Sequence, residues 1–149
     1  MAEQESVKSL NQLLQGEHMA VDSLNVFISK TEDEDVKKAL QHLQNHHREN
    51  IAALAKYIQS LGGKPQENLG MKGTMAETML NLEFGKKADS VDIIEKVIEG
   101  ETKGINMAEK VLRGALDDES RRFVEKILDQ DRKHLDQFQT QVSQLLKSN

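Results

Sequence analysis

An acid and a histidine three residues apart, Asp131 and His134, lie in a stretch of strong helical periodicity near the end of the printed sequence. On a helix at about 100° per residue, they share a side with Phe123, Ile127 and Phe138. Burying an unpaired carboxylate there costs several kcal/mol, whereas an acid-x-x-His pair pointing into a helix bundle can hold a metal ion. One such pair alone more often means a solvated aspartate and a core histidine, so its meaning depends on the other helices.

An internal repeat supplies further polar residues at matching positions. When the two halves of the sequence are aligned, polar residues fall at the same positions in the apolar stripes of corresponding helices. Apolar matches at helical spacing arise by chance more easily than such polar matches do. The repeat therefore predicts a helix hairpin used twice, with its polar residues at one buried level. The pairs are Glu17 with Glu101, Gln44 with Asp131, and His47 with His134.

Apolar residues at helical spacing predict four long helices, joined within each half by very short links. Residues 31–34, Thr-Glu-Asp-Glu, read as a capping box that begins the second helix. Gly62, Gly63 and Pro65 end that helix, and Asp117 is the predicted N-cap of the last one. The predicted helices cover residues 4–30, 31–61, 89–113 and 118–147.

The connection from residue 62 to residue 87 is long enough to run the length of a bundle. A second capping box at residues 74–77 predicts a short amphipathic helix within it. Such a crossover lets the second and third long helices run parallel. The predicted fold is all-α: an antiparallel four-helix bundle with one long crossover, forming a single domain over residues 1–149.

Composition narrows the classes of function. A net charge of −5 argues against general nucleic-acid binding, and the lack of cysteine excludes disulfides and thiolate metal sites. The first residues have neither a basic nor an apolar region of a secretory signal, and no apolar run reaches membrane-spanning length. We expect a cytoplasmic protein without nucleic-acid or membrane partners.

Taken together, the polar residues of the four helices resemble the ferritin-like superfamily, close to rubrerythrin and bacterioferritin domains and to small bacterial ferritin-like bundles. The pattern of that superfamily is Glu, then Glu-x-x-His, then Glu, then Glu-x-x-His on successive helices. The resemblance covers essentially the whole chain. It implies a carboxylate-rich site for one or two iron ions, with manganese or zinc as alternatives. The implied metal ligands are Glu17, His47, Glu101, Asp131 and His134, with Gln44 as a weak ligand or a neighbour that hydrogen-bonds the ligands.

Two positions depart from the superfamily pattern. Gln44 replaces a bridging glutamate with a neutral amide, and Asp131 replaces the other with a shorter acid. Three carboxylates then face the four positive charges of two divalent ions. We therefore expect weaker binding of a second ion, and stronger binding on the side of Asp131 and His134.

The resemblance also implies an activity, ferrous-iron oxidation or peroxide consumption in stress protection, and a homo-oligomer, with a dimer favoured over a storage shell. The alternative is a structural or partner-binding helical bundle, a dimeric stress protein with weak or lost metal chemistry. Histidines 18, 42 and 46 are predicted to lie at the surface. Gly16 and Gly100, beside the two glutamates, suggest close helix approach or room beside the site.

Overall fold

The computed structural model describes residues 2–69, 80 and 89–147. Four α-helices make up this part of the chain, and no strand occurs in it. The helices confirm the predicted all-α class. The predicted capping box and short helix of the crossover fall mainly at residues 70–79 and 81–88, outside the described residues. The helices are α1 (Ala2–Lys30), α2 (Glu34–Ser60), α4 (Ser90–Leu112) and α5 (Asp118–Lys147).

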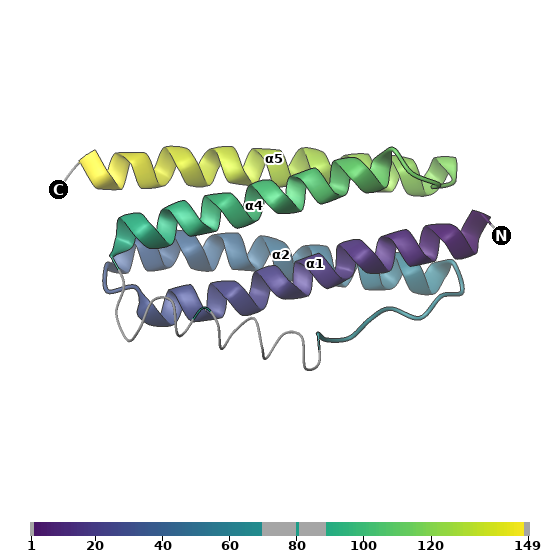
Figure 1. Cartoon of the computed structure of the whole chain (residues 1–149), viewed down its shortest axis with the longest axis horizontal. Helices are drawn as coiled ribbons and strands as arrows, with labels where there is room; N and C mark the ends of the chain where they lie inside the picture. The colour runs from purple at the N-terminus through teal and green to yellow at the C-terminus, as the bar shows by residue number, and fades with distance from the viewer. Residues whose placement is uncertain (1, 70–79, 81–88, 148–149) are drawn as a thin grey trace.

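The four helices form a bundle in which neighbours run antiparallel. Helices α1 and α5 run in one direction and α2 and α4 in the other (Figure 1). The contacting pairs are α1 with α2, α4 with α5, α1 with α4, and α2 with α5, so the parallel pairs lie diagonally. This arrangement confirms the predicted bundle with α2 parallel to α4. No helix of the described residues is long and apolar enough to cross a membrane.

The N-terminus of α2 is capped by Asp33, so the predicted capping box beginning at Thr31 is wrong. The Asp33 carboxylate accepts hydrogen bonds from the backbone N–H groups of Asp35 and Val36, at 2.9 and 3.2 Å. The Thr31 hydroxyl instead donates to the Phe27 carbonyl at 2.8 Å, in the last turn of α1. An aspartate beside the helix start is as good a cap as a threonine, and here the backbone of Asp33 is extended, as an N-cap requires.

The start of the crossover lies along α1. Gly62 adopts a positive φ of 80°, which ends α2 as predicted. The Asn11 amide donates to the Lys64 carbonyl at 3.0 Å, and the Gln66 N–H donates to the Asn11 side-chain oxygen at 2.9 Å. Nε2 of His18 lies 2.9 Å from the Gln66 carbonyl, and His18 is half-buried rather than exposed.

The N-terminus of α5 is tied to α1 and α2. The Asp117 carboxylate accepts from the Ser120 N–H at 2.8 Å, which confirms Asp117 as the predicted cap. It also accepts from the hydroxyls of Ser6 and Ser120, at 2.8 and 2.9 Å, and both serines are fully buried. The Tyr57 hydroxyl lies 3.0 Å from that of Ser120, so the hydrogen bonds of Asp117 and Ser120 together connect three helices.

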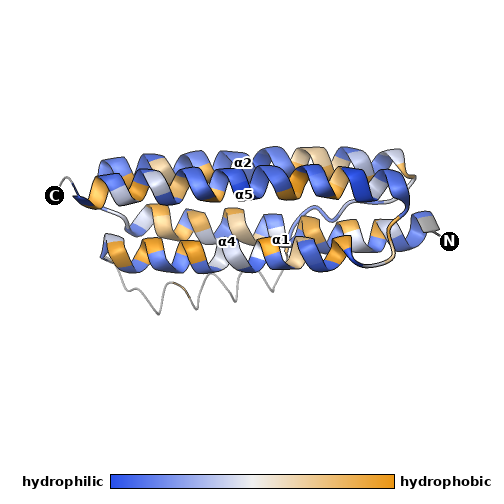
Figure 2. Ribbon diagram, turned by 90° about the horizontal axis from the view of Figure 1, so that it is seen from above, coloured by the Kyte–Doolittle hydropathy of each residue, from blue (hydrophilic) through white to orange (hydrophobic). Residues whose placement is uncertain are grey.

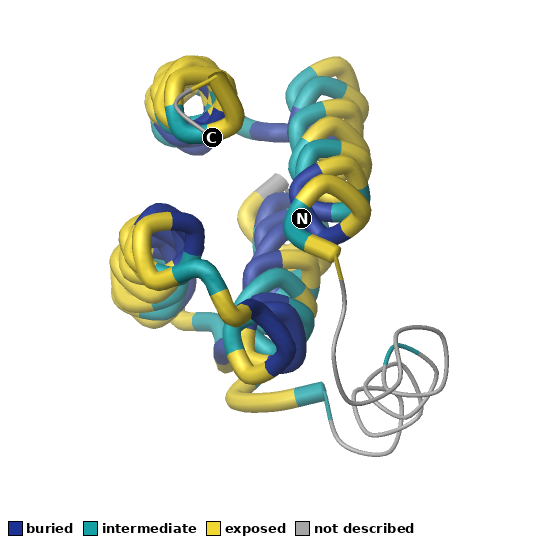
Figure 3. The backbone as a smooth tube through the Cα atoms, turned by 90° about the vertical axis from the view of Figure 1, so that its left-hand side faces the viewer, coloured by how far each residue is buried: buried dark blue, intermediate teal, exposed yellow. Residues whose placement is uncertain are grey.

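The core consists of two apolar clusters with a polar layer between them. Hydrophobic residues alternate with hydrophilic ones along each helix (Figure 2). The buried side of each helix faces the interior of the bundle (Figure 3). The repeated polar positions of the sequence fall between the two clusters. One cluster contains Leu10, Leu13, Leu14, Leu54, Ile58, Ala108, Val111, Leu116, Val124, Ile127 and Leu128. The other contains Leu24, Phe27, Val36, Ala39, Leu40, Leu43, Ile93, Ile94, Val97, Phe138 and Val142.

Candidate functional site: a buried layer of carboxylates and histidines

The imidazole of His47 lies between two carboxylates from different helices. Its Nδ1 is 2.5 Å from Glu17 Oε2 of α1, and its Nε2 is 2.6 Å from Glu101 Oε1 of α4. The side chain of His47 is 7% exposed. The predicted convergence of these three residues is therefore present, and both ring nitrogens are engaged by carboxylates.

The electrostatics favour a charged ring. Burial opposes the charge on His47, but hydrogen bonds with Glu101 and Glu17 and the charges of both carboxylates outweigh it and raise the pKa to about 10. Burial also raises the pKa of Glu17, although its contact with His47 works against that shift. An imidazolium at His47 thus supplies positive charge to this half of the layer.

The second half of the layer centres on Asp131 of α5. Its Oδ1 lies 2.8 Å from Nε2 of His46 and accepts a hydrogen bond from the Asn50 amide at 3.0 Å. The same Asn50 amide donates to Glu17 Oε1 at 3.2 Å. Glu17 and Asn50 therefore join the two halves into one hydrogen-bonded network.

The prediction that His46 lies at the surface is wrong. His46 is 5% exposed, and Asn50 is 7% exposed. Both are buried because α2 packs against α1 on one side and α5 on another, which widens its buried face beyond the narrow apolar stripe. The sequence offered one signal for Asn50: it is a polar residue one turn beyond His47.

Gln44 is directed toward α1. Its amide donates to the Val21 carbonyl at 3.0 Å and to the Asn25 side-chain oxygen at 2.7 Å. At the position of Gln44, the ferritin-like pattern has a glutamate that bridges two metal ions. Here the amide is used to hold α2 against α1 beside the layer.

His134 does not occupy a place equivalent to that of His47, in spite of the repeat. Its ring stacks on His46 with centroids 3.8 Å apart, and His42, which is exposed as predicted, lies 5.8 Å away. Burial, followed by the charges of His46 and His42, lowers the pKa of His134. Its Nδ1 is buried and has no hydrogen-bond partner among the described residues.

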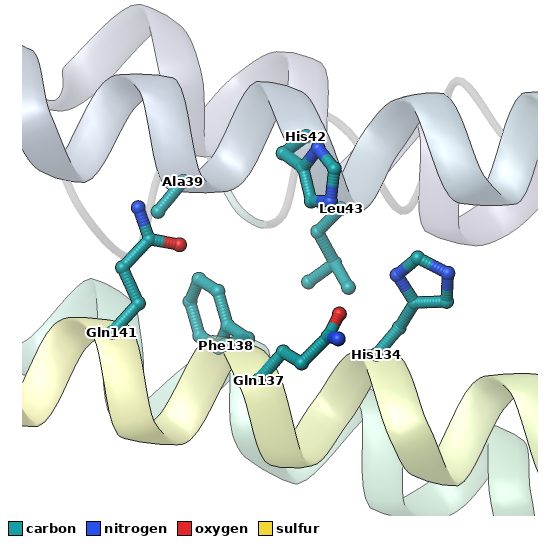
Figure 4. A pocket seen from close by; sticks show the side chains of 7 residues that line it. All are labelled: Ala39, His42, Leu43, His134, Gln137, Phe138 and Gln141. Carbon is teal, nitrogen blue, oxygen red and sulfur yellow. The ribbon is translucent and has the colours of Figure 1, made fainter.

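A pocket of about 220 Å³ opens beside His134 in the seam between α2 and α5 (Figure 4). His42 and His134 face each other across this seam. The lining residues are Ala39, His42, Leu43, His134, Gln137, Phe138 and Gln141.

The two mid-helix glycines do not mark close helix approach. A Cβ atom built on Gly16 or Gly100 would meet nothing within 4 Å outside its own helix, and both residues are exposed. The suggestion of tight packing at these positions is wrong.

The side chains as they stand do not fit a two-metal centre. Gln44 is turned toward α1, both nitrogens of His47 are used by carboxylates, and Asp131 is held by His46 and Asn50. In the part of the chain that the structure describes, no group of three or more His, Asp or Glu residues encloses a place for an ion. The donor types themselves, imidazole and carboxylate, suit iron, manganese or zinc.

Comparisons with known proteins agree with the fold. A family model described as "Domain of unknown function (DUF2383)" matches residues 5–114. A two-domain protein from Anabaena variabilis, containing DJ-1/ThiJ/PfpI-like and ferritin-like domains, has a crystal structure that superposes with a TM-score of 0.76 at 19% identity. The match covers 99% of this chain and 40% of that one. This likeness concerns the fold alone and confirms a ferritin-like four-helix bundle. No curated protein matches the sequence.

Proposed function

The chain belongs to the DUF2383 family of domains of unknown function, and for this member we propose that it is a ferritin-like protein that binds one divalent transition-metal ion in the polar layer. Iron is the first candidate, with manganese and zinc as alternatives. The candidate donors are Glu17, Glu101 and Asp131, together with His47, which would have to lose its proton and its contact with one of the two carboxylates to bind an ion. That His134 also binds the ion, and that a second ion binds, remain predictions.

One observation carries the proposal: three carboxylates from three helices, one buried and two largely shielded from solvent, lie together between two apolar clusters. The side chains of Glu17, Glu101 and Asp131 are 11%, 12% and 10% exposed. Removing several like charges from water is costly, and a divalent cation among them offsets that cost. The charge of His47 balances only one of the three.

A bound ion would supply Lewis acidity and, if it is iron, redox chemistry. Ferrous-iron oxidation and peroxide consumption rest on the resemblance to ferritin-like proteins, and they stay predictions.

Metal titration tests the proposal. Chelator-stripped protein is titrated with Fe²⁺ without oxygen and, separately, with Mn²⁺ and Zn²⁺, and the bound metal is measured after gel filtration. We expect about one ion per chain, with affinity reduced at least about tenfold in Glu17→Gln, since even partners of metal ligands cost that much when lost. Glu125→Gln on the exposed surface of α5 is the matched control and should bind like the wild type. Protein that retains no ion at tenfold metal excess would refute the proposal.

A second candidate function is a metal-free helical module that binds a partner or a second copy of itself. The observation in its favour is that His47 already bridges Glu17 and Glu101, so the chain supplies its own positive charge between these carboxylates. Absence of bound metal in the titration, together with a dimeric native mass, would favour this candidate over the first.

A further inference from the structure

Three side-chain atoms of the kinds that bind metal ions surround a single atom, the amide nitrogen of Asn50. Asn50 Nδ2 lies 3.2 Å from Glu17 Oε1, 3.0 Å from Asp131 Oδ1 and 3.4 Å from His46 Nε2. The donors come from α1, α5 and α2, respectively. The His46 nitrogen also lies 2.8 Å from Asp131 Oδ1, so it donates its proton to that carboxylate, and an ion bound there would replace this proton. All four side chains lie within the buried layer.

We infer that the Asn50 amide occupies the position of a cation, and that Glu17, His46 and Asp131 form a latent site for one transition-metal ion that is closed while the amide stays in place. This inference rests on the proposed function and adds two residues to it, His46 as a ligand and Asn50 as the residue that controls access.

The amide is suited to this role by its chemistry. Its NH₂ group offers two hydrogen-bond donors and no acceptor, so it satisfies two carboxylates at once, as a small cation would. Metal–oxygen and metal–nitrogen bonds are about 2.0–2.2 Å long. An ion in place of the nitrogen would therefore draw each donor inward by about 1 Å and would require the amide to leave.

Removing the amide should open the site. In Asn50→Ala the blocking group is gone and the space is free, whereas Asn50→Leu removes the amide but fills the space with apolar atoms. We expect Asn50→Ala to bind Zn²⁺ at least about tenfold more tightly than the wild type in calorimetric titration at neutral pH. Asn50→Leu should bind no more tightly than the wild type. Asn45→Ala, on the exposed face of the same helix, is the matched control and should match the wild type.

The role of His46 is tested in the opened protein. Adding His46→Ala to Asn50→Ala should remove the gain in Zn²⁺ affinity, whereas adding His42→Ala, at the exposed histidine one turn earlier, should leave it. Folding of each variant is checked by circular dichroism, and Asn50→Ser replaces Asn50→Ala if the alanine variant does not fold.

The outcomes separate this inference from the proposed function. Zn²⁺ affinity in Asn50→Ala that equals or falls below that of the wild type overturns the inference, even if the wild type binds metal. An equal gain in Zn²⁺ affinity in Asn50→Leu also overturns the inference, because the ion would then bind elsewhere. Tight binding only in the opened variant, with none in the wild type, supports the inference and refutes the proposed function.

Discussion

At the scale of single residues, equivalent positions in the repeat have different surroundings in the polar layer. His47 and His134 occupy equivalent positions in the repeat, but only His47 lies between two carboxylates. His134 stacks on His46 instead, and burial lowers its pKa. The residue types alone could not distinguish the two, because the groups around each ring come from other helices: α1 and α4 for His47, and α2 for His134.

The raised pKa of His47 predicts how the stability of the metal-free protein depends on pH. The folded-state pKa is about 10, against 6.5 for an unperturbed histidine. A group whose pKa is raised on folding stabilises the native state fully below its unfolded pKa, and this contribution is lost as the pH rises through the folded pKa. We expect the difference in unfolding free energy between the wild type and His47→Gln to be constant below pH 6.5 and to shrink between about pH 6.5 and pH 10.

Urea unfolding of both metal-free proteins at several pH values measures this difference. The comparison between the two proteins cancels the titration of distant groups. If the difference in unfolding free energy stays constant or grows up to pH 10, the imidazole of His47 is not protonated in the folded state.

At the scale of helices, side chains that contact more than one element stabilise the end of the bundle that holds the α4–α5 link. Asp117 caps α5 and also binds the buried hydroxyl of Ser6 in α1. Arg121 of α5 donates to the backbone carbonyls of Leu112, the last residue of α4, and of Gly114 and Leu116 in the link that follows. These contacts fix the short link between α4 and α5.

Asp117→Ala should therefore cost more than the loss of an ordinary cap. A helix cap contributes about 1 kcal/mol, and each buried hydroxyl left without an acceptor adds about 1 kcal/mol or more. We expect a loss of about 2–3 kcal/mol in unfolding free energy by chemical denaturation. Asp118→Ala, the exposed acid in the next position, is the control and should change stability by less than about 0.5 kcal/mol. Equal effects in the two variants would show that the Asp117 contacts contribute little.

At the scale of the whole molecule, the polar layer divides the core into two apolar clusters and draws side chains from all four helices. A ligand held in this layer would contact several helices at once. Metal binding should therefore stabilise the complete bundle rather than one hairpin.

Saturating metal should raise the melting temperature. An ion that binds only the folded state at a hundredfold excess over its Kd adds about 2.7 kcal/mol of stability. For a chain of this length that corresponds to a rise of roughly 5–10 °C. Differential scanning calorimetry with and without Zn²⁺ measures the shift, and the double variant Glu17→Gln, Glu101→Gln should show little of it. An equal shift in the double variant would indicate binding outside the polar layer.

The sequence by itself determined the four helices, their order, the antiparallel hairpins and the apolar stripes, because helical periodicity and chain breaks are local properties. It also identified Glu17, His47, Glu101 and Asp131 as residues of one layer, since the repeat places equivalent positions at the same level.

Only the tertiary structure decided the contacts within that layer. The sequence missed His46 and Asn50, because burial from a second neighbouring helix cannot be read from the periodicity of α2 alone. It likewise could not show that Gln44 turns toward α1, or that Asn50 reaches both Glu17 and Asp131. Which donors meet depends on side-chain directions across four helices, and these are set by packing between segments far apart in the chain.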